Sequence, residues 1–196
     1  MTSFILLIIV AYILGSIPFG YIVAKLKGVD ITKTGSRATS TTNVSRSLGW
    51  RWAILSGLLD FSKGVVAAYL AIFFLADQWQ IVAVCLMPII GHVFPVWLKF
   101  KGGKGAAPFF GAMLVFLGIE TFLFFFLIWL AILFITRLMS LTNILFPWML
   151  VIILYFYFPF HYFIYGLAGA ILITFALRGN IDRLIKKTEP KVIFKW

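Results

Sequence analysis

A short stretch rich in glycine and lysine is one of two segments in this sequence that could bind an anion. Residues 100–105 read Phe-Lys-Gly-Gly-Lys-Gly. Consecutive glycines let several backbone N–H groups converge on one anion, and Lys101 and Lys104 add positive charge. An apolar segment begins directly after Gly105, so a helix N-terminus could add further donors. Gly105 stands where a nucleotide-binding P-loop has its magnesium-binding Ser or Thr, which excludes that motif. A flexible turn anchored by lysines is the alternative interpretation.

The second candidate segment is the loop 35–49, which is bounded by Gly35 and Gly49. Arg46 could grip a phosphate with two parallel hydrogen bonds. The uncharged hydrogen-bonding side chains of this loop are Ser36, Thr39, Ser40, Thr41, Thr42, Asn43 and Ser45. Such a dense set favours a second phosphate contact over a solvated linker.

Polar residues inside apolar segments are costly in a membrane, so each is a candidate for function. Asp60 and Lys63 are three residues apart and could pair on one helix face. We interpret them as a structural ion pair near the membrane interface. His92, in the sequence Gly-His-Val-Phe-Pro, could be an acid–base group or phosphate donor, or a packed helix residue.

The C-terminal basic segment contains Asn180 between Arg178 and Arg183. It could bind anionic lipid headgroups or contact the substrate. The sequence has no His-x4-Asp pattern, since Trp97 follows His92 at that spacing, and it has no cluster of metal-binding side chains. Two anion-binding loops without a strong base favour catalysis by positioning and charge neutralisation, with the substrate supplying the base.

The elements that must position these groups are membrane segments. The 196 residues are 63% hydrophobic and only 12% charged, which excludes an ordinary soluble domain and predicts one membrane domain over residues 1–196. The net charge of +11 does not indicate nucleic-acid binding, because the cations alternate with apolar runs. Cys85 is the single cysteine, so no disulfide forms within the chain.

We predict seven apolar segments, each a candidate membrane span. Their approximate bounds are 3–24, 53–76, 80–98, 106–119, 121–136, 144–158 and 161–177. The fourth is the least regular, because Pro108, Gly111 and Gly118 interrupt it and Glu120 closes it. Several are shorter than the roughly 20 residues that a spanning helix prefers, which tilting or burial among neighbours accommodates.

All 17 Lys and Arg residues are expected on one side of the membrane. Lys63 is placed in the first turns of the second segment, on that same side. The others lie in alternate loops and the tail: Lys25, Lys27, Lys33, Arg37, Arg46, Arg51, Lys99, Lys101, Lys104, Arg137, Arg178, Arg183, Lys186, Lys187, Lys191 and Lys195. The opposite loops contain Asp77, Glu120 and His161. This asymmetry predicts an outside N-terminus and a cytoplasmic C-terminus.

Six short motifs in order resemble one family. They are GSIPFGYIVAK at 15–25, DI-x3-GS-x5-TN-x2-R-x2-G at 30–49, LLD-x2-KG at 58–64, GH-x-FP at 91–95, FKGGKG-x-A at 100–107 and N-I-x-R-L at 180–184. Together they resemble the bacterial acyl-phosphate:glycerol-3-phosphate acyltransferases, the PlsY family, from about residue 11 to Glu189.

The resemblance implies a seven-helix, all-α integral membrane enzyme of the bacterial cytoplasmic membrane, with its active site facing the cytoplasm and no cofactor or metal. Such an enzyme transfers a fatty acyl chain from acyl phosphate to the 1-hydroxyl of glycerol 3-phosphate, giving lysophosphatidic acid and phosphate. The donor's phosphate accepts the hydroxyl proton, membrane lipid surrounds the protein, and a monomer is favoured. The implied catalytic residues are Ser36, Arg46, Lys104 and His92. The implied substrate-binding residues are Thr42, Asn43, Gly102, Gly103, Gly105, Asn180 and Lys101.

The chain departs from the family pattern at several positions. In the first motif Arg37 and Ser40 replace glycines and Ala38 is also altered, while Leu177 replaces a histidine of the third motif. Asn143 stands where the family's S-L-x-S ends in serine. These changes keep two alternatives open: transfer to another phosphorylated acceptor, and a lipid-binding membrane subunit without catalysis.

Overall fold

The computed structural model describes residues 1–192, and every regular element in that range is helical. The α-helices are α1 (Thr2–Ser16), α2 (Phe19–Leu26), α3 (Thr41–Leu48), α4 (Trp50–Phe74), α5 (Gln78–Val93), α6 (Ala106–Thr136), α7 (Met139–Tyr157), α8 (Phe160–Ala176) and α9 (Arg178–Ile185), with a 3-10 turn η1 (Val96–Leu98). This confirms the all-α prediction. Lys195, counted above among the cations of the tail, lies outside the described residues.

Five helical stretches in residues 1–192 are long and apolar enough to cross a membrane. They are Thr2–Leu26, Trp50–Phe74, Gln78–Leu98, Ala106–Thr136 and Met139–Tyr157. A sixth is obtained if α8 and α9, which meet at 64°, form one broken span. Helices suit this environment because each satisfies its own backbone hydrogen bonds.

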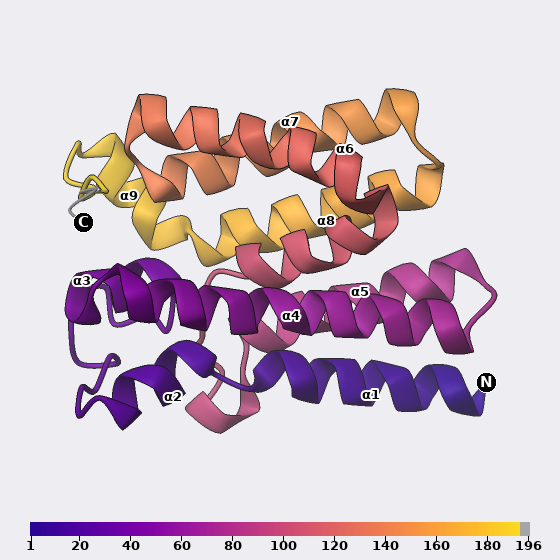
Figure 1. Ribbon diagram of the computed structural model, residues 1–196, viewed down its shortest axis with the longest axis horizontal. Coiled ribbons are helices and arrows are strands. Elements are labelled where there is room, and N and C mark those ends of the chain that lie inside the picture. The colour runs from indigo at the N-terminus through magenta and orange to yellow at the C-terminus, as the bar shows by residue number, and fades with distance from the viewer. Residues whose placement is uncertain (193–196) are drawn as a thin grey trace.

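Helix α6 is a hairpin of two helical arms rather than one long rod. Gly118 has φ 74° and ψ 165°, which are not helical values, and the chain reverses direction there (Figure 1). In a straight helix Phe110 and Trp129 would be about 28 Å apart, yet their ring centroids are separated by only 6.0 Å. The reversal falls where the fourth apolar segment of the sequence ends, so the fourth and fifth segments are the two arms.

The polar loops gather at one end of the molecule. Figure 1 shows the N-terminus at one end of the long axis and the helices α3 and α9 at the opposite end. The loop before α3 and the short helix α9, which are separated by more than 130 positions in the sequence, therefore reach the same end. The segments that could bind an anion are brought together by this arrangement.

Helix α4 begins at Trp50, so Lys63 lies near the middle of the helix. Its placement in the first turns of the segment was wrong, and the reason is that the polar first turn of α4 was assigned to the preceding loop. Its ammonium group donates to the backbone oxygens of Gly15 and Ile17 and to Asp60 Oδ1 at 2.6 Å. Pro18 interrupts the helix between α1 and α2, and beside this break Ile17 O accepts from Phe19 N as well as from Lys63.

Glycine contacts bring the central helices close together. A side chain at Gly91 of α5 would overlap the backbone of α1, and one at Gly64 of α4 would overlap the backbone of α6 at Pro108. Small residues of this kind let membrane helices approach closely. The next residue of α5, His92, lies against Asp60 of α4 and against Gly103 in the loop before α6.

Candidate active site

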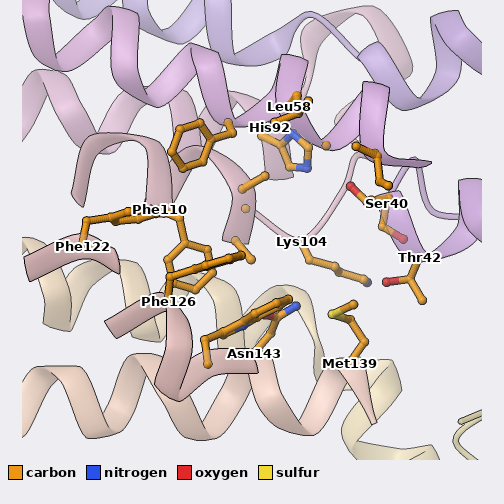
Figure 2. Close-up of a pocket in the computed structure, with 18 residues that line it drawn as sticks. Ser40, Thr42, Leu58, His92, Lys104, Phe110, Phe122, Phe126, Met139 and Asn143 are labelled. Carbon is orange, nitrogen blue, oxygen red and sulfur yellow. The ribbon is translucent and has the colours of Figure 1, made fainter. Parts of the chain in front are cut away.

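A cavity of about 440 Å³ runs between α4, α5, α6 and α7 and has two chemically different halves. One half is walled by aromatic side chains, including Phe110, Phe122 and Phe126 (Figure 2). The other half contains polar groups, among them His92 and Lys104. A cavity of this kind suits a molecule with an apolar chain and a polar head.

A smaller cavity of about 30 Å³ lies beside the first and is lined mainly by polar side chains. It collects five of the residues implied by the family motifs: Ser36, Thr42, Arg46, Lys104 and Asn180. They come from the first loop, α3, the glycine-rich loop and α9. The fold therefore joins segments that are far apart in the sequence into one anion-binding surface.

The two cavities share five lining residues, which mark the junction between the polar and the apolar regions. They are Ser40, Thr42, Lys104, Met139 and Asn143. In Figure 2 the Lys104 side chain extends between Ser40 and Thr42 on one side and Asn143 and Met139 on the other. A group transferred between substrates held in the two cavities would pass this junction.

Lys104 is the cation at the centre of the site. Its Nζ donates to the backbone oxygen of Ala176 at 2.7 Å, which orients the ammonium group. Burial lowers the pKa of Lys104 below its usual value, and the nearby charges of Arg183 and Arg178 lower it further, while Glu189 acts in the opposite direction. An anion bound here would favour the charged form and gain a strong interaction.

The first loop is held from inside by Asn43. This buried side chain accepts a hydrogen bond from Ser36 N at 3.1 Å and donates to the backbone oxygens of Ile31, Thr34 and Ala38. Asn43 lines neither cavity, so its contacts shape the loop that presents Ser36. Arg37, where the family has glycine, has φ 56° in the left-handed region that glycine adopts more easily.

The glycine-rich loop packs on the end of α5. Gly102 N donates to Val93 O, and Gly103 N donates to His92 O at 2.9 Å. A side chain at Gly103 would overlap the His92 imidazole, so glycine is needed here for close approach. The expectation that these two N–H groups converge on an anion was wrong, because both are already bonded to α5.

The unpaired backbone N–H groups lie just after the glycine pair, where α6 begins. Gly105, at φ 81°, begins α6, and Ala106 and Ala107 follow in its first turn. All three line the large cavity, so the N-terminus of α6 supplies the unpaired N–H groups. Lys101 is exposed and lines neither cavity.

His92 forms a contact that the sequence motifs did not indicate. Its Nδ1 is 3.4 Å from Asp60 Oδ1, on the neighbouring helix α4. The side chains of Asp60 and Lys63 are only 1% and 0% exposed. His92 thus connects a buried ion pair with the glycine-rich loop. The sequence spacing could not show this, since the two residues are 32 positions apart and meet only by helix packing.

Glu189 is the functional candidate that sequence reasoning missed. Its carboxylate accepts hydrogen bonds from Ser140 Oγ at 3.0 Å, Asn180 Nδ2 at 2.8 Å and Arg183 Nε at 2.7 Å. It lines the small cavity, so the chain after α9 closes one side of the site. Its position within a basic tail was the available signal, because a carboxylate among several cations often pairs with them.

Leu177 also lines the small cavity, and it is only 2% exposed. The altered third motif therefore places an apolar side chain beside Asn180, at the position where the resemblance implied a histidine. This surface has fewer hydrogen-bond donors as a result.

Comparison with known proteins identifies this site. A family model described as glycerol-3-phosphate acyltransferase matches residues 5–187. The glycerol-3-phosphate acyltransferase of Aquifex aeolicus is 37% identical over 187 residues, covering 94% of this chain and 97% of the relative. That of a Wolbachia species from Brugia malayi is 39% identical over 184 residues, covering 93% and 95%.

Two crystal structures of PlsY, an integral membrane glycerol 3-phosphate acyltransferase, have the same fold. The glycerol 3-phosphate form superimposes with a TM-score of 0.91 at 37% identity, covering 97% of this chain and 96% of the other. The lysophosphatidic acid form gives 0.88 at 37% identity, with 96% and 95% covered. The predicted family is confirmed over nearly the whole chain: the protein belongs to the glycerol-3-phosphate acyltransferase family and is an integral membrane acyltransferase.

Proposed function

We propose that this protein transfers a fatty acyl chain from acyl phosphate to the 1-hydroxyl of glycerol 3-phosphate. The products are lysophosphatidic acid and inorganic phosphate. The observation that carries the proposal is the pair of adjacent cavities, one lined by aromatic rings and one by anion-binding groups, with Lys104 at their junction. Related structures in glycerol 3-phosphate and lysophosphatidic acid forms support the same acceptor and product.

In this proposal the acyl chain occupies the aromatic half of the large cavity. Its phosphate lies at the N-terminus of α6 against Gly105 and Lys104, where unpaired N–H groups and a cation meet. The glycerol 3-phosphate lies across the junction with its phosphate directed at the small cavity, where Ser36, Arg46 and Asn180 face it. Asn43, Gly102 and Gly103 act through loop shape, and exposed Lys101 adds positive charge to the approach.

The reaction needs no separate strong base. The 1-hydroxyl oxygen attacks the acyl carbonyl carbon, the carbon–oxygen bond to phosphate breaks, and the hydroxyl proton passes to an oxygen of the departing phosphate. Lys104 neutralises the phosphate charge in both the donor and the leaving group. His92, whose Nδ1 faces Asp60, presents its Nε2 side toward Gly103 and the cavity, where it can donate to phosphate.

We further propose that one chain forms a single domain with seven membrane crossings, an outside N-terminus and a cytoplasmic active site. The two arms of α6 supply two of the crossings, and the cationic loops lie at the same end as the site. The active unit in this proposal is a monomer. The location that follows is the bacterial cytoplasmic membrane.

The first experiment measures lysophosphatidic acid formation by the purified protein, with palmitoyl phosphate or palmitoyl-CoA as donor and glycerol 3-phosphate as acceptor. Product from palmitoyl phosphate alone would support donor, acceptor and reaction together. Product from palmitoyl-CoA would contradict the acyl-phosphate donor, and product from neither, with folded protein, would contradict the reaction.

Single-cysteine labelling tests the membrane topology. Cys85 is buried, so a membrane-impermeant maleimide should report only an introduced cysteine. Glu120→Cys, at the turn of α6, should react from outside intact cells, and Arg137→Cys should react only after the membrane is opened. Labelling of both positions from one side would show that the second arm of α6 does not cross.

Leu177 supports a second candidate acceptor. Because an apolar side chain replaces a hydrogen-bond donor in the small cavity, another phosphorylated polyol with fewer hydroxyl groups near this position could bind in place of glycerol 3-phosphate. Comparing kcat/KM for glycerol 3-phosphate with that for 1,3-propanediol monophosphate would distinguish the two acceptors.

A further inference from the structure

Asn143 occupies the junction of the two cavities. It lies in the second turn of α7, lines both cavities, and faces the end of Lys104 in Figure 2. Among the junction residues it is the one that hydrogen-bonds to the aromatic half of the site. Asn143 is therefore a polar side chain at the point where the aromatic lining meets the polar lining.

The orientation of the Asn143 amide is fixed by Trp129. The indole Nε1 of Trp129 lies 2.9 Å from Asn143 Oδ1. An indole nitrogen can only donate, so the amide oxygen must face Trp129 and the NH2 group must point away from it. Within residues 1–192 no protein acceptor is bonded to Asn143 Nδ2, which leaves this donor available to a ligand.

Trp129 is itself held by the wall of the large cavity. Its ring stacks on Phe126 with centroids 5.6 Å apart and meets the edge of Phe110 at 6.0 Å. The hydrogen bond thus fastens a polar donor to the rigid aromatic surface proposed to hold the acyl chain. An acyl chain bound on that surface and the Asn143 amide group therefore keep a constant relative position.

We infer that Asn143 is a further catalytic residue, whose side-chain NH2 donates a hydrogen bond to the carbonyl oxygen of the acyl phosphate, with Trp129 as its positioning residue. This inference rests on the proposed acyl transfer. As the glycerol hydroxyl adds to the carbonyl carbon, that oxygen gains negative charge, which it loses when the bond to phosphate breaks. A donor fixed at the oxygen lowers the energy of this intermediate more than that of the substrate.

The other junction residues are less suited to this role. Met139 has no hydrogen-bond donor. Lys104 is oriented by Ala176 O and is assigned to the phosphates in the proposed function. The hydroxyls of Ser40 and Thr42 lie on the α3 side of Lys104, away from the aromatic wall (Figure 2). Asn143 is the fixed donor on the acyl side.

A double-mutant cycle in the purified full-length protein tests the inference, with palmitoyl phosphate and glycerol 3-phosphate as substrates. Asn143→Ala should lower kcat by about 100-fold, the usual effect of losing one such donor, with the KM for glycerol 3-phosphate nearly unchanged. Trp129→Phe keeps the aromatic ring but frees the amide to rotate, so kcat should fall by a smaller factor. In the double variant kcat should equal that of Asn143→Ala, since Trp129 acts through the amide.

A matched control is available on α7. Trp148 donates its indole N–H to Thr174 Oγ1 at 3.0 Å and lines neither cavity, so Trp148→Phe should leave kcat unchanged. Thermal unfolding in detergent checks that each variant is folded. Unchanged kcat in Asn143→Ala, or multiplicative effects of the two substitutions, would overturn the inference. A rise in the KM for glycerol 3-phosphate alone would also overturn it, because Asn143 would then bind the acceptor. A wild-type protein without activity would overturn the proposed function and this inference together.

Discussion

The Nδ1 atom of His92 lies 3.4 Å from Oδ1 of Asp60, and the same oxygen accepts a hydrogen bond from Lys63 at 2.6 Å. Helices α4 and α5 thereby share a buried polar cluster directly beneath the glycine-rich loop. The second carboxylate oxygen of Asp60 is buried and has no hydrogen-bond partner among the described residues. The cluster fixes the face of α5 on which the loop rests.

Asp60→Asn should destabilise the protein strongly, because Lys63 would keep a buried charge without its anionic partner. Breaking a buried pair in this way typically costs about 3–5 kcal/mol of unfolding free energy. Thermal or SDS-induced unfolding in detergent measures the loss. The double variant Asp60→Asn/Lys63→Met should recover part of the stability, and a double variant less stable than Asp60→Asn would contradict this explanation.

Gly103→Ala should displace the glycine-rich loop, since the added methyl group would overlap the His92 imidazole. We expect a large loss of kcat with a smaller loss of stability, because the N-terminus of α6 would shift away from the donor's phosphate. Gly179→Ala is the control, as its added methyl group meets no atom within 4 Å. Equal activity of the two variants would show that close packing at position 103 is not required.

The activity should fall on the alkaline side as Lys104 loses its proton. Burial and the charges of Arg183 and Arg178 lower the pKa of Lys104, so the charged form disappears at a pH below the usual value of 10.5. The pH profile of kcat/KM for the acyl phosphate reports this ionisation in the free enzyme. In Lys104→Arg the alkaline decline should move to higher pH, because a guanidinium group keeps its proton. An unchanged decline would assign it to another group.

Glu189→Gln should weaken the binding of glycerol 3-phosphate at the small cavity. The neutral amide loses the charged interaction with Arg183 and accepts less well from Asn180 and Ser140. Because Asn180 lines the cavity and loses the charged acceptor that positions it, the KM for glycerol 3-phosphate should rise. Asp182→Asn on the exposed face of α9 is the control and should leave KM unchanged. A Glu189→Gln variant with wild-type KM would place the acceptor elsewhere.

Gly118→Ala should strain the turn between the two arms of α6. The φ and ψ angles of Gly118 lie in a region almost restricted to glycine, where another residue costs about 1–3 kcal/mol. Since an added methyl group would meet no neighbour within 4 Å, any loss of unfolding free energy comes from the backbone. Unaltered stability would mean that the arms can separate by another backbone route.

The helical segments were predictable because hydropathy acts over many residues at once. The turn at Gly118 was also visible, since glycine and a following carboxylate interrupt an apolar run. The position of Lys63 within α4 was not, because Trp50 and Arg51 begin the helix although they resemble the preceding polar loop. Hydropathy marks the apolar interior of a helix better than its polar ends.

The sequence predicted which residues line the site better than it predicted how those residues contact one another. Ser36, Arg46 and Asn180 line one cavity as the motifs implied. The contact between His92 and Asp60 depends on how two helices pack, which local spacing does not determine. Likewise, the hydrogen bonds of Gly102 and Gly103 to α5 show that a glycine pair can serve packing where a sequence pattern indicates anion binding.

The contacts of Lys63 with Gly15 O and Ile17 O have a consequence for biogenesis. Helix α1 leaves the ribosome before α4, so these two carbonyl groups are already in the bilayer when Lys63 enters it. The Lys63 ammonium group would be costly to insert alone, but its two carbonyl acceptors are then already in place. A chain that lacked α1 would expose this lysine to lipid, and we expect the cell's membrane proteases to degrade it.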